Sequence, residues 1–262
     1  MSDHMTKPLA ELAEDIIEDG IVDAEEVAKI RERIYEDDII DREEADFLFS
    51  INDAVSGANN DPGWKELFVQ ALSDHVLKDE ISPDEIDEDE EQYLISKIQA
   101  DDQVDDVELA LLVNIIATAK KTSESFQAFV LSSLRDAVLE DGVVDEEEVK
   151  MIRKVIYGTG SGAGEGVDRA EADFLFELND TTSGKKNHPS WKDLFVEAIT
   201  KHVLEDEVSP GEVDEDESEW LIGKIEADDQ YDDNEKALLA NIKTKAKSID
   251  DKLKSKIDLL KL

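Results

Sequence analysis

Apolar residues recur along the chain at intervals that place their side chains on one face of an α-helix. The first segment has Leu9, Leu12, Ala13, Ile16 and Ile17 at positions i, i+3, i+4, i+7 and i+8. The alternation of period two that is typical of strands does not occur, so the pattern predicts an all-α fold with short connections between antiparallel helices. The further stripes before residue 120 are Val27, Ile30 and Ile34; Phe47, Leu48, Ile51 and Val55; Trp64, Leu67, Phe68, Ala71, Leu72 and Val76; Tyr93, Leu94 and Ile98; and Leu109, Leu112, Ile115, Ile116 and Ala119.

The second half of the chain repeats the first. Residues 16–23 match residues 138–145, and residues 64–69 match residues 191–196, in residue type and order. Such self-similarity indicates a duplicated structural unit. The polar stretch 120–125 separates the two copies. We therefore predict two tandem homologous helical-bundle domains of about six helices each, at 1–121 and 122–248, and a C-terminal amphipathic helix at 249–262.

The predicted C-terminal helix combines an apolar stripe with a positive charge. Ile249, Leu253, Ile257 and Leu260 recur at helical spacing, and the last twenty residues contain seven lysines and three aspartates. Such a helix either packs back on the acidic body of the protein or docks on a protein partner or a membrane surface. The first alternative is favoured, because the acidic loops nearby offer counter-charge.

Composition narrows the class of protein. With 69 acidic and 28 basic residues the net charge is -41, which argues against nucleic-acid binding because little would neutralise phosphates. Hydrophobic residues make up 40%, enough to bury a core. The chain has no cysteine, which excludes disulfides and zinc-thiolate sites. The first ten residues lack the apolar region of a secretory signal, and no apolar run approaches a membrane span, so we expect a cytoplasmic protein.

A short acidic string recurs eight times along the chain. At its first appearance Asp19 and Gly20 are followed by two β-branched residues, by Asp23 and, three positions on, by Glu26. An aspartate or serine followed three residues later by glutamate has the spacing of a capping box at a helix start. The same interpretation places Pro83 and Pro210 at the first position of a helix. The expected pairs are Asp23 with Glu26, Asp41 with Glu44, Ser82 with Glu85, Asp105 with Glu108, Asp145 with Glu148, Asp168 with Glu171, Ser209 with Glu212, and Asp232 with Glu235.

Capping alone leaves the aspartates upstream of these pairs unexplained. In an EF-hand loop, ligands come from positions 1, 3, 5, 7, 9 and 12 and glycine stands at position 6. Asp19, Gly20, Asp23 and Glu26 fit the second half of that pattern, but the first half is missing, so two half-loops would have to pool their ligands. Carboxylate-rich oxygen coordination predicts Ca²⁺, with Mg²⁺ or Mn²⁺ less favoured. The candidate metal ligands are Asp19, Asp23, Glu26, Asp37, Asp41, Glu44, Asp101, Asp105, Glu108, Asp141, Asp145, Glu148, Asp168, Glu171, Asp228, Asp232 and Glu235.

The Asp-Gly-x-Val-x-x-x-Glu string between two helices, with later Asp-x-x-Val-x-x-x-Glu strings, resembles the TerB-like group of tellurite-resistance proteins. The resemblance covers each half of the chain separately. It implies an all-α fold, acidic loops associated with divalent cations, and a role in bacterial stress response or in membrane-linked complexes.

Two functions from different classes remain open at this point. The first is a non-enzymatic calcium-binding protein that acts as a sensor, a buffer or a cation-stabilised adaptor with a protein partner. The second is an acidic protein-interaction or DNA-mimic module without specific metal binding. A DNA mimic needs carboxylates spread at phosphate-like intervals, whereas here they gather at predicted helix junctions, which favours the first. No combination of nucleophile and base appears in the sequence, so we do not expect an enzyme.

Overall fold

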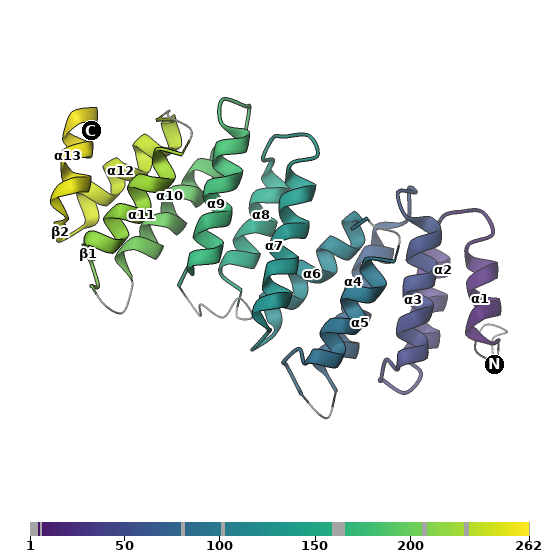
Figure 1. The fold of residues 1–262 in the computed structure, drawn as a ribbon. Coiled ribbons are helices and arrows are strands. Elements are labelled where there is room, and N and C mark those ends of the chain that lie inside the picture. Colours follow the sequence, from purple (N-terminus) through teal and green to yellow (C-terminus); the bar gives the residue numbers. More distant parts are fainter. Residues whose placement is uncertain are drawn as a thin grey trace. The chain divides into compact units, whose positions relative to one another are not determined.

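The computed structural model describes residues 5, 7–79, 82–100, 103–158, 166–205, 209–227 and 231–261. The protein is all-α, as the apolar periodicity predicted, apart from two strands of two residues each. None of the helices in these ranges has both the length and the apolar content needed to cross a membrane. The elements labelled in Figure 1 are α1 (Leu9–Ile16), α2 (Ala24–Ile34), α3 (Arg42–Val55), α4 (Pro62–Leu77), α5 (Glu88–Ile98), α6 (Asp106–Thr118), α7 (Glu124–Val138), α8 (Glu146–Ile156), α9 (Arg169–Thr182), α10 (Pro189–Leu204), β1 (Glu212–Val213), α11 (Glu215–Ile225), α12 (Asp233–Lys245), β2 (Ser248–Ile249) and α13 (Asp251–Leu260).

The chain divides into two compact units, Met1–Val130 and Leu131–Leu262, and the division falls inside α7. The polar stretch 120–125, taken as the separation of the copies from sequence, leads directly into this helix. There the Oγ of Ser123 accepts a hydrogen bond from the backbone N–H of Phe126 at 2.9 Å, as an N-terminal cap does.

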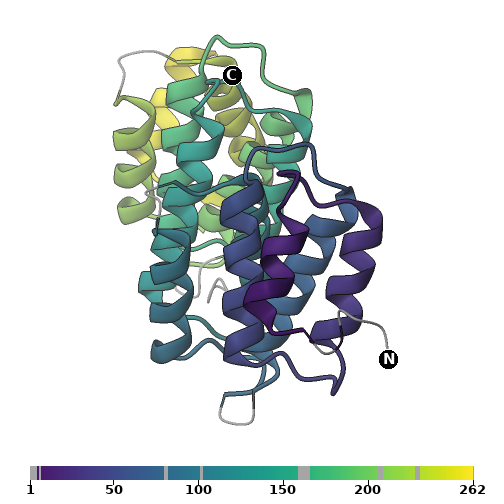
Figure 2. The same cartoon turned by 90° about the vertical axis from the view of Figure 1, so that its right-hand side faces the viewer.

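In the first unit α4 is the central helix, packed against α2, α3 and α6. Trp64, Leu67 and Phe68 on α4 are almost completely buried. Figure 2 shows α1, in the darkest purple, beside α3, against which it packs. The predicted apolar stripes of this unit are confirmed, because only Ala13 and Ile17 among their residues are half-buried and all others are buried.

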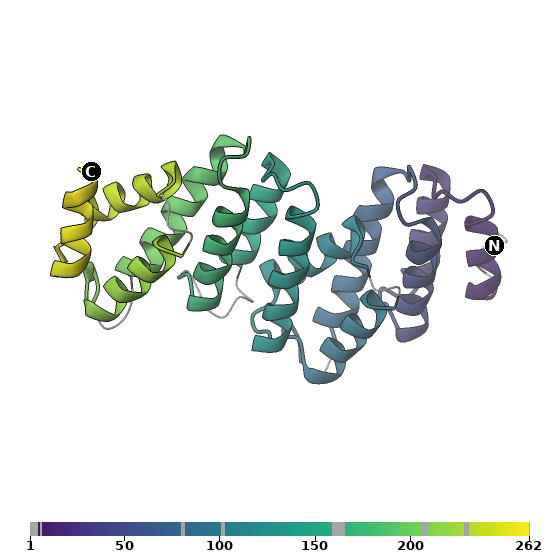
Figure 3. The same ribbon diagram turned by 45° about the horizontal axis from the view of Figure 1, so that its top comes forward.

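The second unit repeats this plan, with α10 packed against α8, α9 and α12. Its last helix, α13, lies against α11 and α12 (Figure 3). Just before α13, β2 pairs in parallel with β1, with Glu212 opposite Ser248 and Val213 opposite Ile249. The equivalent pairing in the first unit is a single bridge between Glu85 and Lys121. These short pairings lack the alternation that would predict a strand, so the sequence did not reveal them.

Two predicted helix starts were wrong. Ser82 and Ser209 do not cap helices, and Pro83 and Pro210 do not occupy first helical positions, since both lie in turns before the helix. The backbone takes a left-handed conformation two residues after each serine, with φ of 66° at Asp84 and 82° at Gly211. A helix cannot continue through such a residue, so α5 and α11 begin farther along, with the cap pairs Asp87 with Glu90 and Asp214 with Glu217.

The buried tryptophans of the two units differ in one hydrogen bond. In the first unit the indole N–H of Trp64 donates to Oδ1 of Asn52 at 3.3 Å. In the second unit Oδ1 of the equivalent Asn179 accepts instead from Nδ2 of Asn234 at 2.8 Å. The indole N–H of Trp191 is buried and has no hydrogen-bond partner among the described residues. Asn234 therefore leaves a buried donor unsatisfied, which is energetically costly.

We expect Asn234→Val, which introduces the residue of the first unit, to stabilise the second unit. The change frees Asn179 to accept from Trp191 and should raise the free energy of unfolding by about 1 kcal/mol. Urea denaturation followed by tryptophan fluorescence measures the effect. The reciprocal change, Val107→Asn, should destabilise the first unit by displacing Trp64. An unchanged or lower stability of the Asn234→Val protein would contradict this account.

Candidate functional site

Six of the eight acidic strings form capping boxes at the starts of helices, and two further boxes lie at Asp87 and Asp214. In the second unit the backbone N–H of Glu148 donates to Oδ1 of Asp145 at 2.8 Å, and the N–H of Asp145 donates to Oε2 of Glu148 at 2.7 Å. This reciprocal arrangement satisfies two backbone donors and places negative charge at the positive end of the helix. It is present at Asp23 with Glu26, Asp41 with Glu44, Asp87 with Glu90, Asp105 with Glu108, Asp145 with Glu148, Asp168 with Glu171, Asp214 with Glu217, and Asp232 with Glu235.

The pairs at Asp87 and Asp214 were missed from sequence because each lies in a long acidic run with several possible registers. One signal could have fixed the register. A buried β-branched residue directly precedes the capping aspartate in both places, Ile86 in the first unit and Val213 in the second. Val22 before Asp23 has the same position and is completely buried.

The upstream aspartates, which capping did not explain, shape the turns before the helices. The side chains of Asp19, Asp37 and Asp141 each accept a hydrogen bond from the backbone N–H two residues later, at 3.1, 3.1 and 2.8 Å. Asx turns of this kind stabilise a tight turn without any ion. Gly20 has a φ of 79° and lies within this turn, beyond Ile17, the C-cap of α1. The candidate ligands Asp101 and Asp228 lie outside the described residues.

Each half-loop pairs with the loop that enters the central helix of its own unit. The backbone N–H of Val22 donates to Oδ1 of Asn60 at 2.8 Å, and the N–H of Asp61 donates to the carbonyl of Val22 at 2.8 Å. In the second unit the N–H of Val144 donates to Oδ1 of Asn187 at 3.0 Å. The backbone of the half-loop is thus fixed by the loop before α4 or α10, and its aspartate side chains are left exposed.

The candidate strings at Asp105 and Asp232 tie helices together. Oδ2 of Asp105, at the start of α6, accepts hydrogen bonds from Nδ2 of Asn52 and Oγ of Ser56 in or next to α3, both at 2.8 Å. Asp232, at the start of α12, makes the same contact with Asn179 of α9 at 2.8 Å. Both oxygens of these carboxylates are therefore engaged by the fold.

The glutamates of the strings differ in how deeply they are buried. Those of the Asp41, Asp105, Asp168 and Asp232 strings are buried, with exposed fractions of 9% or less. These buried glutamates are Glu44, Glu108, Glu171 and Glu235.

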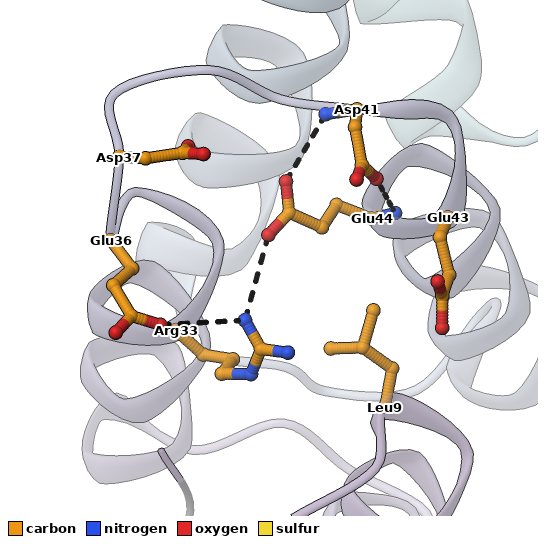
Figure 4. Close-up of a pocket in the computed structure, with 7 residues that line it drawn as sticks. All are labelled: Leu9, Arg33, Glu36, Asp37, Asp41, Glu43 and Glu44. Atoms are coloured by element: carbon orange, nitrogen blue, oxygen red, sulfur yellow. Dashed lines mark hydrogen bonds and ion pairs between the residues drawn. The ribbon is translucent and has the colours of Figure 1, made fainter. Parts of the chain in front are cut away.

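The string at Asp41 borders a hollow of 490 Å³, and the positively charged side chain of Arg33 is part of its lining (Figure 4). Nη1 of Arg33 lies 3.6 Å from Oε1 of Glu44, whose other oxygen caps Asp41. Burial raises the pKa of Glu44, and the arginine offsets part of that effect. The guanidinium of Arg33 thus already supplies positive charge to this carboxylate cluster.

The two Asp-Gly turns, residues 19–26 and 141–148, are more open. Partial burial and the negative charges of Asp145 and Asp141 raise the pKa of Glu148 to about 7. Partial burial, with Asp23 and Asp19 nearby, also raises the pKa of Glu26, while the hydrogen bond from the backbone N–H of Asp23 and the charge of Lys29 oppose this. Each turn therefore concentrates three carboxylates that repel one another.

A third carboxylate group of this kind lies before α5. Partial burial and the charges of Asp87 and Asp79 raise the pKa of Glu90 to about 7. The hydroxyl of Ser82 lies within hydrogen-bonding distance of all three carboxylates, at 3.3 to 3.5 Å. Sequence reasoning did not include Asp87 or Glu90 among the candidates.

Across the described ranges no three carboxylate or imidazole side chains are placed so as to hold one metal ion. Compared with known proteins, the chain matches no family model, no curated protein and no solved structure. The functional assignment therefore depends on the chemistry of the turns themselves.

Replacing the two kinds of capping aspartate should have different costs. Asp105→Ala removes a cap and leaves Asn52 and Ser56 without their acceptor, so it should lower the free energy of unfolding by about 2–3 kcal/mol. Asp145→Ala removes an exposed cap only and should cost about 1 kcal/mol. Urea denaturation of both variants tests the difference. Equal losses would show that the Asp105 contacts contribute no stability.

Proposed function

We propose that this protein is a non-enzymatic divalent-cation binder whose sites are the Asp-Gly turns 19–26 and 141–148, one in each unit. The remaining described strings are assigned to structure, because their carboxylates tie helices together, are buried or already have an arginine. The group of Asp79, Asp87 and Glu90 is also left out, because its carboxylates already share the hydroxyl of Ser82. The proposal therefore narrows the candidate ligands to two equivalent sets. These are Asp19, Asp23 and Glu26, and Asp141, Asp145 and Glu148.

The observation that carries the proposal is the state of Glu148. Its carboxyl is partly buried beside Asp141 and Asp145, its pKa is raised to about 7, and no basic side chain contributes to that value. Two or three negative charges in one turn repel strongly where solvent screening is reduced. A bound cation would remove this repulsion, and its binding energy would add to the stability of the folded state.

Part of each carboxylate in these turns is outside the capping network. The hydrogen bonds in the turn use Oδ1 of Asp141, Oδ1 of Asp145 and Oε2 of Glu148. Within the described residues, Oδ2 of both aspartates and Oε1 of the glutamate have no hydrogen-bond partner. The carboxylates are not gathered around one point in the described ranges, so binding requires their side chains to turn toward a common ion. Three carboxylate oxygens, with water and backbone carbonyls, are then the donor type that Ca²⁺ prefers over softer-ligand metals.

The resemblance to the TerB-like group implies the same association of acidic loops with divalent cations. Exposed turns with few ligands suit a sensor, a buffer or a cation-stabilised adaptor better than a permanently bound structural ion, since affinity rises with ligand number and charge. We therefore assign a reversible, calcium-responsive role, with an unidentified protein as its target.

Calorimetric titration of chelator-stripped protein with Ca²⁺, at fixed ionic strength, should show two ions bound per chain. Glu148→Gln keeps the capping geometry, because glutamine also caps, but removes one ligand charge and should weaken one site by about tenfold or more. Asp141→Asn should do the same, because the Asx turn is retained.

Glu147→Gln is the matched control, since it removes the same charge from the neighbouring exposed position and should leave both sites intact. Mg²⁺ serves as the competing ion. Weak heats that are equal for both ions and vanish with added salt would reject the proposal and favour an acidic interaction module.

The raised pKa of Glu148 predicts how pH acts on the metal-free protein. The folded chain holds this proton up to about pH 7, whereas the ordinary pKa is 4.5, so the group's contribution to stability is complete below pH 4.5 and is lost as the pH rises to about 7. The melting temperature should therefore fall less over this interval in Glu148→Gln than in the parent or in Glu147→Gln. Thermal scans between pH 4.5 and 7.5 measure this, and identical pH profiles for all three proteins would contradict it.

A further inference from the structure

Lysine–glutamate pairs join the last helix, α13, to α11 of the second unit. Nζ of Lys252 lies 2.8 Å from Oε1 of Glu215 and 2.5 Å from Oε1 of Glu219, both on α11. One helical turn later, Lys256 pairs with Glu226 at the end of α11. The five side chains are between 37% and 68% exposed, so these pairs are in contact with solvent.

Two buried apolar side chains add to the same attachment. Leu253 and Ile257 are buried under α13, whereas Leu259 is 77% exposed. A helix of ten residues is not stable alone in water. It therefore depends on α11, and exposed ion pairs of this kind are individually weak and are screened by salt.

The first unit holds the equivalent helix differently. There Phe126 and Val130 are buried as Leu253 and Ile257 are in the second unit, but the polar contacts differ, because the hydroxyls of Ser123 and Ser125 donate to the carboxylate of Glu91 on α5. No lysine takes part in these contacts. The charge pairing is thus a property of the second unit and not a requirement of the repeated fold.

We propose that the acidic face of α11, formed by Glu215, Glu219 and Glu226, is a docking surface for a basic amphipathic helix of a partner protein, and that α13 occupies it as an internal competitor. The partner helix would present lysine or arginine at positions i and i+4 and apolar residues at i+1 and i+5, as Lys252, Lys256, Leu253 and Ile257 do. Lys252 in place between two glutamates is the observation that shows which ligand chemistry this face accepts. The net charge of -41 would also draw a basic partner toward the chain.

Competition between α13 and an added helix provides the test. The probe is a fluorescently labelled peptide with the sequence of residues 248–262, and its anisotropy is measured with full-length chains. In the parent chain α13 is covalently attached and present at high effective concentration, so the peptide should bind weakly. In the double variant Lys252→Gln, Lys256→Gln the internal helix competes less, and the peptide should bind about tenfold more tightly.

Matched controls make the outcome specific. Lys254→Gln removes an exposed lysine of α13 that has no ion pair among the described residues, and should leave peptide affinity at the parent value. A peptide with both lysines replaced by glutamine should lose most of its affinity for the double variant, and 0.5 M NaCl should weaken the parent peptide.

Hydrogen exchange of the full-length double variant provides a second measurement that does not depend on the peptide. Faster exchange in α13, with unchanged exchange in α11 and in residues 124–130, would show release of the helix from an intact unit. Absence of saturable peptide binding to the double variant, or equal affinity for all chains, would overturn the proposal. Because the variants change only α13, this result does not depend on calcium binding at the turns 19–26 and 141–148.

Discussion

The hydrogen bonds between an N-cap aspartate and the glutamate three residues later are the interaction on which this fold depends. A chain with a net charge of -41 must place many carboxylates without self-repulsion. Helix N-termini offer unpaired backbone N–H groups and the positive end of the helix dipole. Asp145 and Glu148 show the solution most simply, since each carboxylate accepts from the backbone of the other residue. Acidity is thereby used to define where the helices begin.

The same capping box begins eight of the described helices. The contacts around each box therefore decide whether its carboxylates have a structural role or are candidates for binding. The aspartate at 105 is engaged on both sides, by its own helix and by Asn52 of α3. The glutamate at 44 is buried against Arg33. Glu148 in the turn at 141–148 has neither an arginine beside it nor a tie to another helix, and its pKa is raised to about 7. The same spacing in sequence thus produces a helix tie, an internal ion pair and an exposed carboxylate cluster.

The features predicted from sequence are those determined by residues close together in the chain. The stripe from Trp64 to Val76 has a helical period, and it does form the buried face of α4. The cap at Asp23 follows from spacing alone. The features that were missed depend on distant partners or on unusual backbone conformations. The contact between Asn52 and Asp105 joins residues 53 apart, and the late start of α5 depends on the left-handed backbone at Asp84.

The two units offset the repulsion between their carboxylates with different basic side chains. The first unit has Arg33 beside a buried glutamate, and at the equivalent of α13 it uses serine hydroxyls, which donate without adding charge. The second unit supplies lysines from α13 to the face of α11. At the Asp-Gly turns, Lys29 and Lys150 pair with the neighbouring Glu25 and Glu147, and the proposed ligands are held mainly by local hydrogen bonds. Under the proposals made above, positive charge for these ligands comes from solution, while on α11 it is supplied by the lysines of α13. A small divalent cation suits the first situation, because the carboxylates lie within one turn. A helix suits the second, because the glutamates are spaced along a helix face.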